Sequence, residues 1–330
     1  MKKRKFGNTD LLVSEVGFGA WGIGGPAMAG AIPIGWGKVD DAASIRALEK
    51  SVDLGINFFD TADFYGFGHS ETLIGKVLGN RQDVIIATKV GHRLANDGSI
   101  VLDYSKTHIL KACDASLKRL QRDAIDYYQL HSAKRAHLEN GECVEAMTML
   151  QAQGKIRYWG ISLNTFNPHP EAEFMMQQQL GSGFQVVLNI INQRAQELIK
   201  TAHAHNYGII ARMPLQFGLL TGKFTPATRF DQNDHRHFRL PPVLLEAALR
   251  DLAEVWPLSQ KYNLAPTSLS LSFVLSHPDV CTVIPGIKTV EQAMENTTDI
   301  VQLQDEDMNF LIQLYRDELC KLVDFMERQG

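Results

Sequence analysis

The sequence predicts an α/β protein of the (β/α)8 barrel class, with an N-terminal β-hairpin and extra C-terminal helices. Short runs rich in β-branched and aromatic residues recur eight times along the 330 residues. Stretches with helical spacing lie between most of these runs, which is the pattern of a parallel sheet. Neither a break in composition nor a strong internal repeat divides the chain. At this length, eight units favour one closed barrel domain over residues 1–330 rather than an open doubly wound sheet.

The composition is that of an ordinary soluble globular protein. With 45% hydrophobic residues, 21% charged residues and a formal charge of -4, the chain has no basic excess that would attract nucleic acid. The four cysteines lie far apart without a C-x-x-C pair, so reduced thiols in the cytoplasm fit better than a disulfide framework or a zinc ribbon. The basic start "KKRK" leads into "FGNTD" instead of an apolar segment, which argues against an export signal. Residues 16–37 carry no charge, but their eight glycines and two prolines argue against a membrane span.

The first expected element is a small hairpin, formed by residues 2–6 and 11–18 across the turn-like stretch "GNTD". The barrel strands are then expected within residues 15–21, 56–62, 84–90, 125–131, 158–163, 184–191, 208–214 and 281–286.

Helices are expected where apolar residues recur with helical spacing after a capping residue. Asp41 opens the helix over 41–55, with Ile45, Leu48 and Val52 on one face and Gly55 at its end. Ser105 opens the helix over 105–121 in the same way. Further helices are expected at 70–79, 141–153, 170–180, 193–206, 267–278 and 289–297. A loop over about 215–240 and an amphipathic stretch over 305–330 are additions to the barrel.

Polar side chains stand at the ends of three of the expected strands. The motifs "FFDTADFYG", "IIATKV" and "YYQLHS" bring Asp60, Lys89 and His131 to the same rim, with Tyr65 on the loop just beyond Asp60. Taken singly, each has a structural interpretation: a strand-end cap for Asp60, a satisfied core residue for His131 and packing for Tyr65. A lysine after "VIIAT" is costly to hold near a barrel core unless a carboxylate pairs with it, and Asp60 can be that partner. Together these residues predict an active site.

This group of side chains also predicts a kind of chemistry. A phenol titrates near ~10 in water, and a neighbouring ammonium favours the phenolate, so a lysine held by an aspartate equips a tyrosine for acid–base work near neutral pH. A histidine beside the phenol offers a hydrogen bond to an oxygen that gains negative charge when a carbonyl is reduced. The sequence has neither a nucleophile elbow nor a metal-ligand cluster, so hydrolysis and zinc chemistry have little support.

Five motifs resemble, in order, the signatures of the aldo-keto reductases: "GINFFDTADFYGFGHSETLIGKVL", "IIATKV", "DYYQLH", "PLQFGLLTGKF" and "VIPGIKTVEQAMENT". The similarity spans essentially the whole chain. The resemblance implies a (β/α)8 barrel that binds NADP(H) across its C-terminal rim and reduces aldehydes and ketones by hydride transfer, with a tyrosine as proton donor. It places the catalytic tetrad on Asp60, Tyr65, Lys89 and His131.

The resemblance also implies which residues hold the cofactor. Ser162, Asn164 and Gln185 match the positions that bind the nicotinamide carboxamide, although Leu163 interrupts the expected Ser-Asn pair. Arg212 stands where many members place an aromatic residue that stacks on the nicotinamide, and a planar guanidinium can stack too. A lysine near the adenosine end suits the 2′-phosphate, so NADPH (NADP+) is favoured over NADH. The other matched positions are Gly19, Ala20, Trp21, Asp60, Pro214, Leu215, Gly218, Leu220, Lys223, Gly286, Lys288, Gln292 and Asn296.

The substrate is expected to be a small carbonyl compound held between aromatic walls. Trp21, Phe64, Tyr65 and His131 are the candidate pocket residues, and Phe67 and His92 are further ones. Core packing is an equal alternative for each phenylalanine. The stretch "DQNDHRHFR" has no third spaced metal ligand, so it is expected to be a solvated loop on the substrate side.

A different function fits the same residues. The resemblance extends to potassium-channel β subunits, so the chain could be an NADP(H)-binding redox sensor or accessory subunit with slow turnover. A barrel isomerase or lyase would leave the adenosine-type segment near the last strand unexplained. The sequence does not identify the substrate, and the exposed faces of the terminal helices could serve an oligomer interface.

The stretch "VGFGAWG" contains the pattern G-x-G-x-x-G, which binds pyrophosphate in open dinucleotide-binding folds. In that fold the third glycine opens a helix, but here "IGGPAMAGAIPIGWGKV" intervenes before any helix can begin. Asp40 and Asp41 are therefore expected to cap the next helix and not to bind a ribose. The glycines are expected to end the first barrel strand and to form part of the pocket wall.

Overall fold

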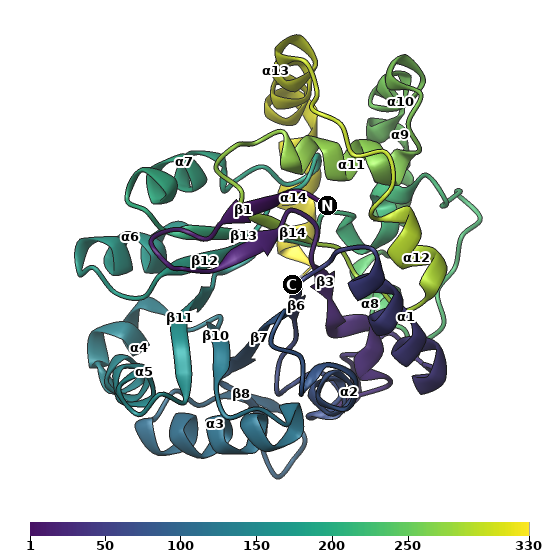
Figure 1. Ribbon diagram of the computed structural model, residues 1–330. Helices are drawn as coiled ribbons and strands as arrows, with labels where there is room; N and C mark the ends of the chain where they lie inside the picture. The colour runs from purple at the N-terminus through teal and green to yellow at the C-terminus, as the bar shows by residue number, and fades with distance from the viewer. Residues whose placement is uncertain (330) are drawn as a thin grey trace.

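The computed structural model describes residues 1–329 and contains eight parallel strands that form a barrel (Figure 1). Neighbouring strands follow the order β14-β13-β12-β11-β10-β7-β6-β3. Parallel bridges from Val16 to Val283 and from Gly19 to Gly286 join the first strand to the last. The strands are β3 (Phe18–Gly19), β6 (Phe58–Asp60), β7 (Ile85–Val90), β10 (Ile125–His131), β11 (Ile156–Ser162), β12 (Gly183–Val187), β13 (Gly208–Arg212) and β14 (Thr282–Ile284). Each predicted strand overlaps one of them, so the predicted barrel is confirmed.

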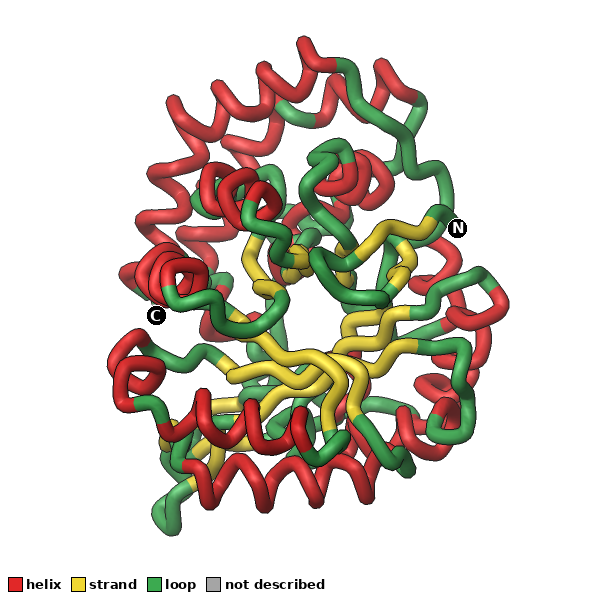
Figure 2. Tube along the Cα trace, turned by 60° about the vertical axis from the view of Figure 1, so that its left-hand side comes forward, coloured by secondary structure: helices red, strands yellow, loops and turns green. Residues whose placement is uncertain are grey.

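Helices surround the strands, as Figure 2 shows. Those that match predicted helices are α1 (Asp41–Asp53), α2 (His69–Leu78), α3 (Lys106–Leu120), α5 (Glu142–Ala152), α6 (His169–Gln177), α7 (Gln196–Ala204), α11 (Pro266–Leu275) and α12 (Val290–Glu295). Ser105 caps α3 as expected, accepting a hydrogen bond from the N–H of His108. The cap of α1 agrees with the expectation: Asp40 accepts from the N–H of Ala42 at 2.9 Å, and Asp41 is the first helical residue. A carboxylate in either place suits the positive end of the helix dipole.

The N-terminal hairpin closes the bottom of the barrel. It consists of β1 (Lys3–Lys5) and β2 (Leu12–Ser14), and Phe6 follows β1. The Phe6 ring is fully buried and meets the Tyr127 ring edge-on at 5.0 Å. It also lies against Gly183 and Gly208, the first residues of β12 and β13, where an added Cβ would collide with it. The absence of side chains at these two glycines makes room for the Phe6 ring.

We expect Phe6→Ala to lower the free energy of unfolding by about 3–5 kcal/mol, because it leaves a cavity that backbone glycines cannot fill. The measurement is urea denaturation followed by circular dichroism. Phe310→Ala is the matched control, because that side chain is 40% exposed and its removal opens no buried cavity. Equal losses in the two variants would show that Phe6 does not support the barrel.

Two short hairpins on the rim were not predicted. The first rim hairpin is β4 (Met28–Ala29) with β5 (Ile32–Pro33), and the second is β8 (His92–Leu94) with β9 (Ile100–Leu102). Their tips touch, because a Cβ added at Gly98 would lie 3.2 Å from the backbone nitrogen of Gly30. Beyond β5, an antiparallel bridge pairs Trp36 with Asp234. The segment that contains the first hairpin therefore connects the second hairpin with the loop around residue 234.

The rest of the chain adds helices outside the barrel. Four were not predicted: α4 (Arg135–Asn140), α8 (Arg236–Arg239), α9 (Pro242–Asp251) and α10 (Trp256–Tyr262). The amphipathic C-terminal stretch forms α13 (Asp305–Leu314), a π-helical turn (Tyr315–Leu319) and α14 (Cys320–Arg328), and its last residue, Gly330, lies outside the described residues. Leu311 and Val323 of this stretch are fully buried. Among residues 1–329, no helix has the length and apolar character needed to cross a membrane.

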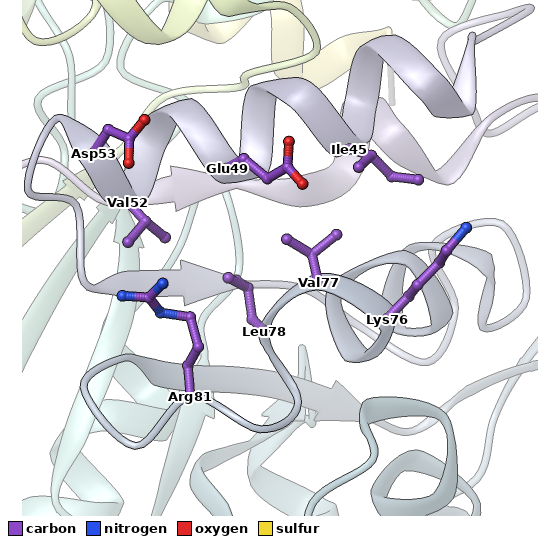
Figure 3. Close-up of a pocket in the computed structure, with 8 residues that line it drawn as sticks. All are labelled: Ile45, Glu49, Val52, Asp53, Lys76, Val77, Leu78 and Arg81. Carbon is purple, nitrogen blue, oxygen red and sulfur yellow. The ribbon is translucent and has the colours of Figure 1, made fainter.

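A surface groove separates α1 from α2 (Figure 3). Acidic side chains of α1 stand on one side, and Lys76 of α2 with Arg81 just beyond that helix stands on the other. The floor is apolar. The lining residues are Ile45, Glu49, Val52, Asp53, Lys76, Val77, Leu78 and Arg81, and none of them is a predicted site residue.

Candidate active site

The four side chains predicted to form the catalytic tetrad lie together at the C-terminal rim. Asp60, Lys89 and His131 stand at or near the ends of β6, β7 and β10, which are adjacent in the sheet. The Nζ atom of Lys89 lies 2.5 Å from Oδ1 of Asp60 and 3.3 Å from the hydroxyl oxygen of Tyr65. The rings of Tyr65 and His131 meet edge-on with centroids 5.9 Å apart. The structure thus brings together residues that lie up to 71 positions apart in the sequence, the separation between Asp60 and His131.

Lys89 is a buried charge with two fixed partners. Its side chain is 0% exposed and donates to Asp60 and, at 2.8 Å, to the carbonyl oxygen of Thr61. Burial alone would lower the pKa of Lys89, but the charges of Asp60 and Tyr65 outweigh burial and raise that pKa above its ordinary value. The ammonium therefore stays charged at neutral pH, 3.3 Å from the Tyr65 oxygen.

Asp60 is held from its other side by two amides. Its Oδ2 atom accepts hydrogen bonds from Nε2 of Gln129 at 2.9 Å and from Nε2 of Gln185 at 2.7 Å. Gln129 was missed by the sequence analysis, although a signal was present. It precedes His131 by two residues in β10, so both side chains point to the same face of the strand.

The loop that carries Tyr65 is held in place by an ion pair whose carboxylate is buried. Glu71 at the start of α2 is fully buried and accepts from the hydroxyl of Thr88 and from Nε of Arg119, both at 2.6 Å. Thr88 precedes Lys89 in β7, so this network joins the strand of Lys89 to the helix that follows Tyr65. Burial, reinforced by the charge of Glu71, raises the pKa of nearby Asp63 well above its ordinary value. The sequence analysis did not identify these supporting residues.

His131 is a half-buried histidine that lies beside a second imidazole and near two cations. Its backbone carbonyl accepts from the hydroxyl of Tyr104 at 2.5 Å, and its ring stacks on the His92 ring with centroids 4.3 Å apart. Burial lowers its pKa well below the ordinary value, and the neighbouring His92, Lys89 and Arg212 lower it further. A neutral imidazole can donate one hydrogen bond, which is what stabilisation of a carbonyl oxygen requires.

Aromatic rings line the approach to Tyr65. Trp21 stacks near the Tyr65 ring at 6.3 Å and meets the rings of Trp36 and His235, each at 5.2 Å. Phe217 completes this aromatic wall at 6.4 Å from Trp21. On the other side, Phe64 meets the rings of Phe67 and His92, each at 5.4 Å. Trp21 and Phe64 were expected here, whereas Trp36 and Phe217 were not.

The stretch "DQNDHRHFR" is exposed along much of its length, as expected, but Asp234 and His235 anchor it to the rim. Asp234 is only 8% exposed and binds Arg236 through both carboxylate oxygens. The ring of His235 packs on Trp21, and its Nδ1 atom lies 3.0 Å from the carbonyl oxygen of Pro33. The sequence did not indicate this anchor, which depends on the bridge between Trp36 and Asp234.

The residues matched to the nicotinamide end lie on neighbouring strands. Ser162 ends β11 and donates to Oε1 of Gln185 at 3.4 Å, while Arg212 ends β13. Arg212 donates to the Leu163 carbonyl and to the Thr165 hydroxyl, but its buried Nε has no partner among the described residues. Asn164 also holds the following turn: its Oδ1 accepts from two backbone N–H groups there.

The residues matched to the adenosine end surround the start of α12. The N–H of Lys288 donates to Oε1 of Gln292 at 2.8 Å, and Nδ2 of Asn296 reaches the carbonyl oxygen of Gly286 at 3.4 Å. Lys223 pairs with Glu295 at 2.9 Å. The Nζ atom of Lys288 lies 6.0 Å from the Trp36 ring centroid, and burial, together with Arg236, lowers the pKa of this lysine.

The other matched positions lie between these two ends. Pro214 and Leu215 precede the 3-10 turn Gln216–Thr221, which contains Gly218 and Leu220. Gly19 ends β3, and Ala20 and Trp21 begin the 3-10 turn Ala20–Gly24. A 3-10 turn and not an α-helix follows "VGFG", so the expectation that this stretch is not the phosphate loop of an open dinucleotide fold is confirmed. Among residues 1–329, no group of three or more histidine, cysteine or acidic side chains could hold a metal ion.

Fold and site together define a barrel oxidoreductase. The chain belongs to the Aldo/keto reductase family, whose model matches residues 15–316. It is 31% identical to the uncharacterized oxidoreductase YqkF of Bacillus subtilis, across 97% of this chain and 99% of that protein. It is 29% identical to the NADH-specific methylglyoxal reductase of Escherichia coli, across 94% and 97% of the two chains. The structure of glycerol dehydrogenase AKR11B4 from Gluconobacter oxydans matches 96% of each chain at 26% identity, with a TM-score of 0.80. The family reduces carbonyl groups with a nicotinamide cofactor.

Proposed function

We propose that the protein reduces an aldehyde or ketone to an alcohol with NADPH, and that Tyr65 supplies the proton. The observation that carries the proposal is the chain of contacts from Asp60 through Lys89 to the Tyr65 hydroxyl, with 2.5 Å and 3.3 Å between successive polar atoms. As Tyr65 gives up its proton, negative charge develops on its oxygen, and the buried ammonium of Lys89 stabilises that charge. Asp60 keeps the lysine in place and charged.

His131 is the proposed hydrogen-bond donor to the substrate oxygen. Its ring faces the Tyr65 ring edge-on, and its pKa is lowered by burial, so it is neutral and does not compete with Tyr65 as the proton source. Trp21 lies near Tyr65 and Phe64 near His92, and such aromatic rings suit a flat or apolar group next to the carbonyl. The reaction therefore needs Tyr65 as acid and His131 as an oriented donor.

The residues at the rim fit a dinucleotide. The Nε atom of Arg212 is buried and unpartnered, and Ser162 of β11 and Gln185 of β12 lie on the two strands next in the sheet. In the proposal these three, with Asn164, hold the nicotinamide end, and a bound NADPH would supply the hydride. The pyrophosphate would lie along Gly218, Leu220 and Lys223, and the adenosine against Gly286, Gln292 and Asn296.

A screen for NADPH oxidation over aldehydes, ketones, sugars and pyridoxal, with NADH in parallel, tests this function. We expect turnover of at least one carbonyl class with NADPH. The matched control is Tyr65→Phe, which keeps the ring and removes the proton donor. Failure of the wild-type protein with every carbonyl, under conditions where it binds NADPH, would contradict the proposal.

Lys288 is the proposed determinant of the preference for NADPH. Aldo-keto reductase yakc of Schizosaccharomyces pombe is named for NADP(+), while the Escherichia coli relative is named NADH-specific, so both cofactors occur among relatives. We expect Lys288→Ala to weaken NADPH binding about 10- to 100-fold, the worth of one charge-assisted hydrogen bond, and to leave NADH binding unchanged. Fluorescence titration with both cofactors measures this. An equal loss of affinity for NADPH and NADH would show that Lys288 does not bind the 2′-phosphate.

A second function has one observation in its favour. The chain is 26% identical to a putative voltage-gated potassium channel subunit beta of Schizosaccharomyces pombe, across 93% of both chains. A redox-sensing accessory subunit would bind NADP(H), turn over carbonyls slowly and associate with a protein partner in fixed proportion. Affinity purification of the expressed protein, with the stoichiometry of any partner measured, distinguishes this role from that of a free enzyme.

We infer a cytoplasmic location for the enzyme. All four cysteines are free in the structure, and Cys113, Cys143 and Cys281 are buried. Burial also raises the pKa of Cys113 to about 12 and that of Cys143 to about 11, so these thiols are protonated and inert. Such thiols suit a reducing compartment.

A further inference from the structure

His92 forms a second layer of the candidate active site. Its ring lies nearly flat on that of His131, with centroids 4.3 Å apart and planes inclined by 24°. The Phe64 and His92 rings meet edge to face, with their centroids 5.4 Å apart. His131 thus has Tyr65 at its edge and His92 against its face.

The local sequence directs His92 to this place. It follows Gly91, whose φ of +128° is open to glycine alone, and a Cβ there would collide with the ring of Tyr104. Tyr104 in turn donates its hydroxyl to the backbone carbonyl of His131. Tyr104 therefore contacts both the residue before β8 and the last residue of β10. These two contacts place the His92 ring against the face of the His131 ring.

A histidine that donates through one ring nitrogen is usually oriented by a hydrogen bond at the other. His131 lacks that support, because its Nδ1 is buried and has no hydrogen-bond partner among residues 1–329. The contacts that fix the ring plane are instead the stacked imidazole of His92 and the edge-on phenol of Tyr65. Stacked aromatic pairs at this separation stabilise one another beyond their buried area.

We propose that His92 is a positioning residue, which orients His131 toward the substrate oxygen by stacking in place of a hydrogen bond at Nδ1. This inference rests on the proposed function, in which His131 donates to the carbonyl. It assigns the role to the flat ring of His92 and not to its nitrogen atoms. The phenyl ring of His92→Phe should therefore still orient His131, whereas the methyl group of His92→Ala should not.

The charges around the stack agree with two neutral rings. Burial lowers the pKa of His92 to about 4, with a further contribution from Lys89. The groups that face the pair are Lys89 on β7, Arg212 on β13 and Tyr65 on its loop, and both cations disfavour a proton on His131. Removing the His92 ring opens one face of His131 to water, which reduces the effect of burial on the His131 pKa.

The test compares His92→Ala with His92→Phe by two readouts. The first is an NMR titration of 13C-labelled histidine, with the His131 signal assigned by its loss in His131→Asn. In the wild-type protein and in His92→Phe, the pKa of His131 should lie well below that of an ordinary histidine, and in His92→Ala it should rise. The second is steady-state kinetics, in which His92→Ala should lower kcat about 10- to 100-fold without changing the KM for NADPH, and His92→Phe should restore most of the lost kcat.

Thermal unfolding and NADPH binding show whether each variant is folded. If His92→Phe is as damaged as His92→Ala, the nitrogen atoms of His92 matter and positioning by stacking is wrong. If His92→Ala leaves both the His131 titration and kcat unchanged, the inference is also wrong. The titration needs no substrate, so an inactive wild-type protein would count against the proposed reductase function while the positioning of His131 is still measured.

Discussion

Tyr65→Phe should abolish carbonyl reduction and leave NADPH binding nearly unchanged. The variant removes one oxygen atom, which lies 3.3 Å from the Lys89 ammonium, and keeps the ring that packs near Trp21 and against His131. Without the hydroxyl, the proton must come from water, so we expect kcat to fall by about 10²–10⁴-fold. The measurement is NADPH oxidation under saturating cofactor.

The matched control for this prediction is Tyr104→Phe, the other tyrosine hydroxyl that contacts the tetrad. Tyr104 donates to the backbone of His131, so its loss should lower activity far less than the loss of the Tyr65 hydroxyl. Burial raises the pKa of Tyr104 far above its ordinary value, which makes it a poor proton donor. Activity retained in Tyr65→Phe would refute the assignment of the proton donor.

Lys89→Met should cost both activity and stability. The substitution keeps the length of the side chain and removes the charge that stabilises the developing phenolate, so we expect a loss of about 10²–10⁴-fold in kcat. It also leaves the carboxylate of Asp60, which is 2% exposed, without a cation. An uncompensated buried charge lowers the free energy of unfolding by about 3–5 kcal/mol, which chemical denaturation measures.

The double variant Asp60→Asn with Lys89→Met separates the two effects of the lysine. Neutralising Asp60 removes the unpaired charge, so the double variant should be more stable than Lys89→Met alone while remaining inactive. Gln129 and Gln185 can still donate to the amide oxygen of the new asparagine, which limits any further loss. A double variant no more stable than the single one would show that Lys89 does not compensate the charge of Asp60.

The barrel and the tetrad could be predicted from sequence because both depend on local patterns. Buried strands are short apolar runs, and Asp60, Lys89 and His131 interrupt these patterns at or near strand ends, where parallel strands bring side chains to one rim. Gln129 was missed, although the alternation of side chains along a strand places it on the same face of β10 as His131. The carbonyl chemistry came from the residue types, while the positions that hold the cofactor came from the resemblance.

The rim above the tetrad could not be predicted in this way, because contacts distant in sequence determine it. Trp36 pairs with Asp234, which lies 198 positions later in the sequence. This bridge holds the adjacent His235 at the rim. The stack of His92 on His131 depends on Tyr104 packing over Gly91. Helix α9 gave a local signal that was not used: Pro242 is its first residue, where proline is favoured.

If the proposed cofactor site is correct, the seam between β3 and β14 sets the moment at which the protein can first bind a dinucleotide. In the barrel, Gly19 lies so close to the backbone of Ile284 and Pro285 that a side chain there would collide, and Gly22 lies against Lys288. The proposed dinucleotide site thus includes residues from both ends of the chain, Gly19 to Trp21 near its start and Gly286 to Asn296 near its finish. A ribosome must complete nearly the whole polypeptide before the ends can meet, and such long-range closure is slow. NADPH would therefore select finished chains over partial ones, and would stabilise the seam once it has formed.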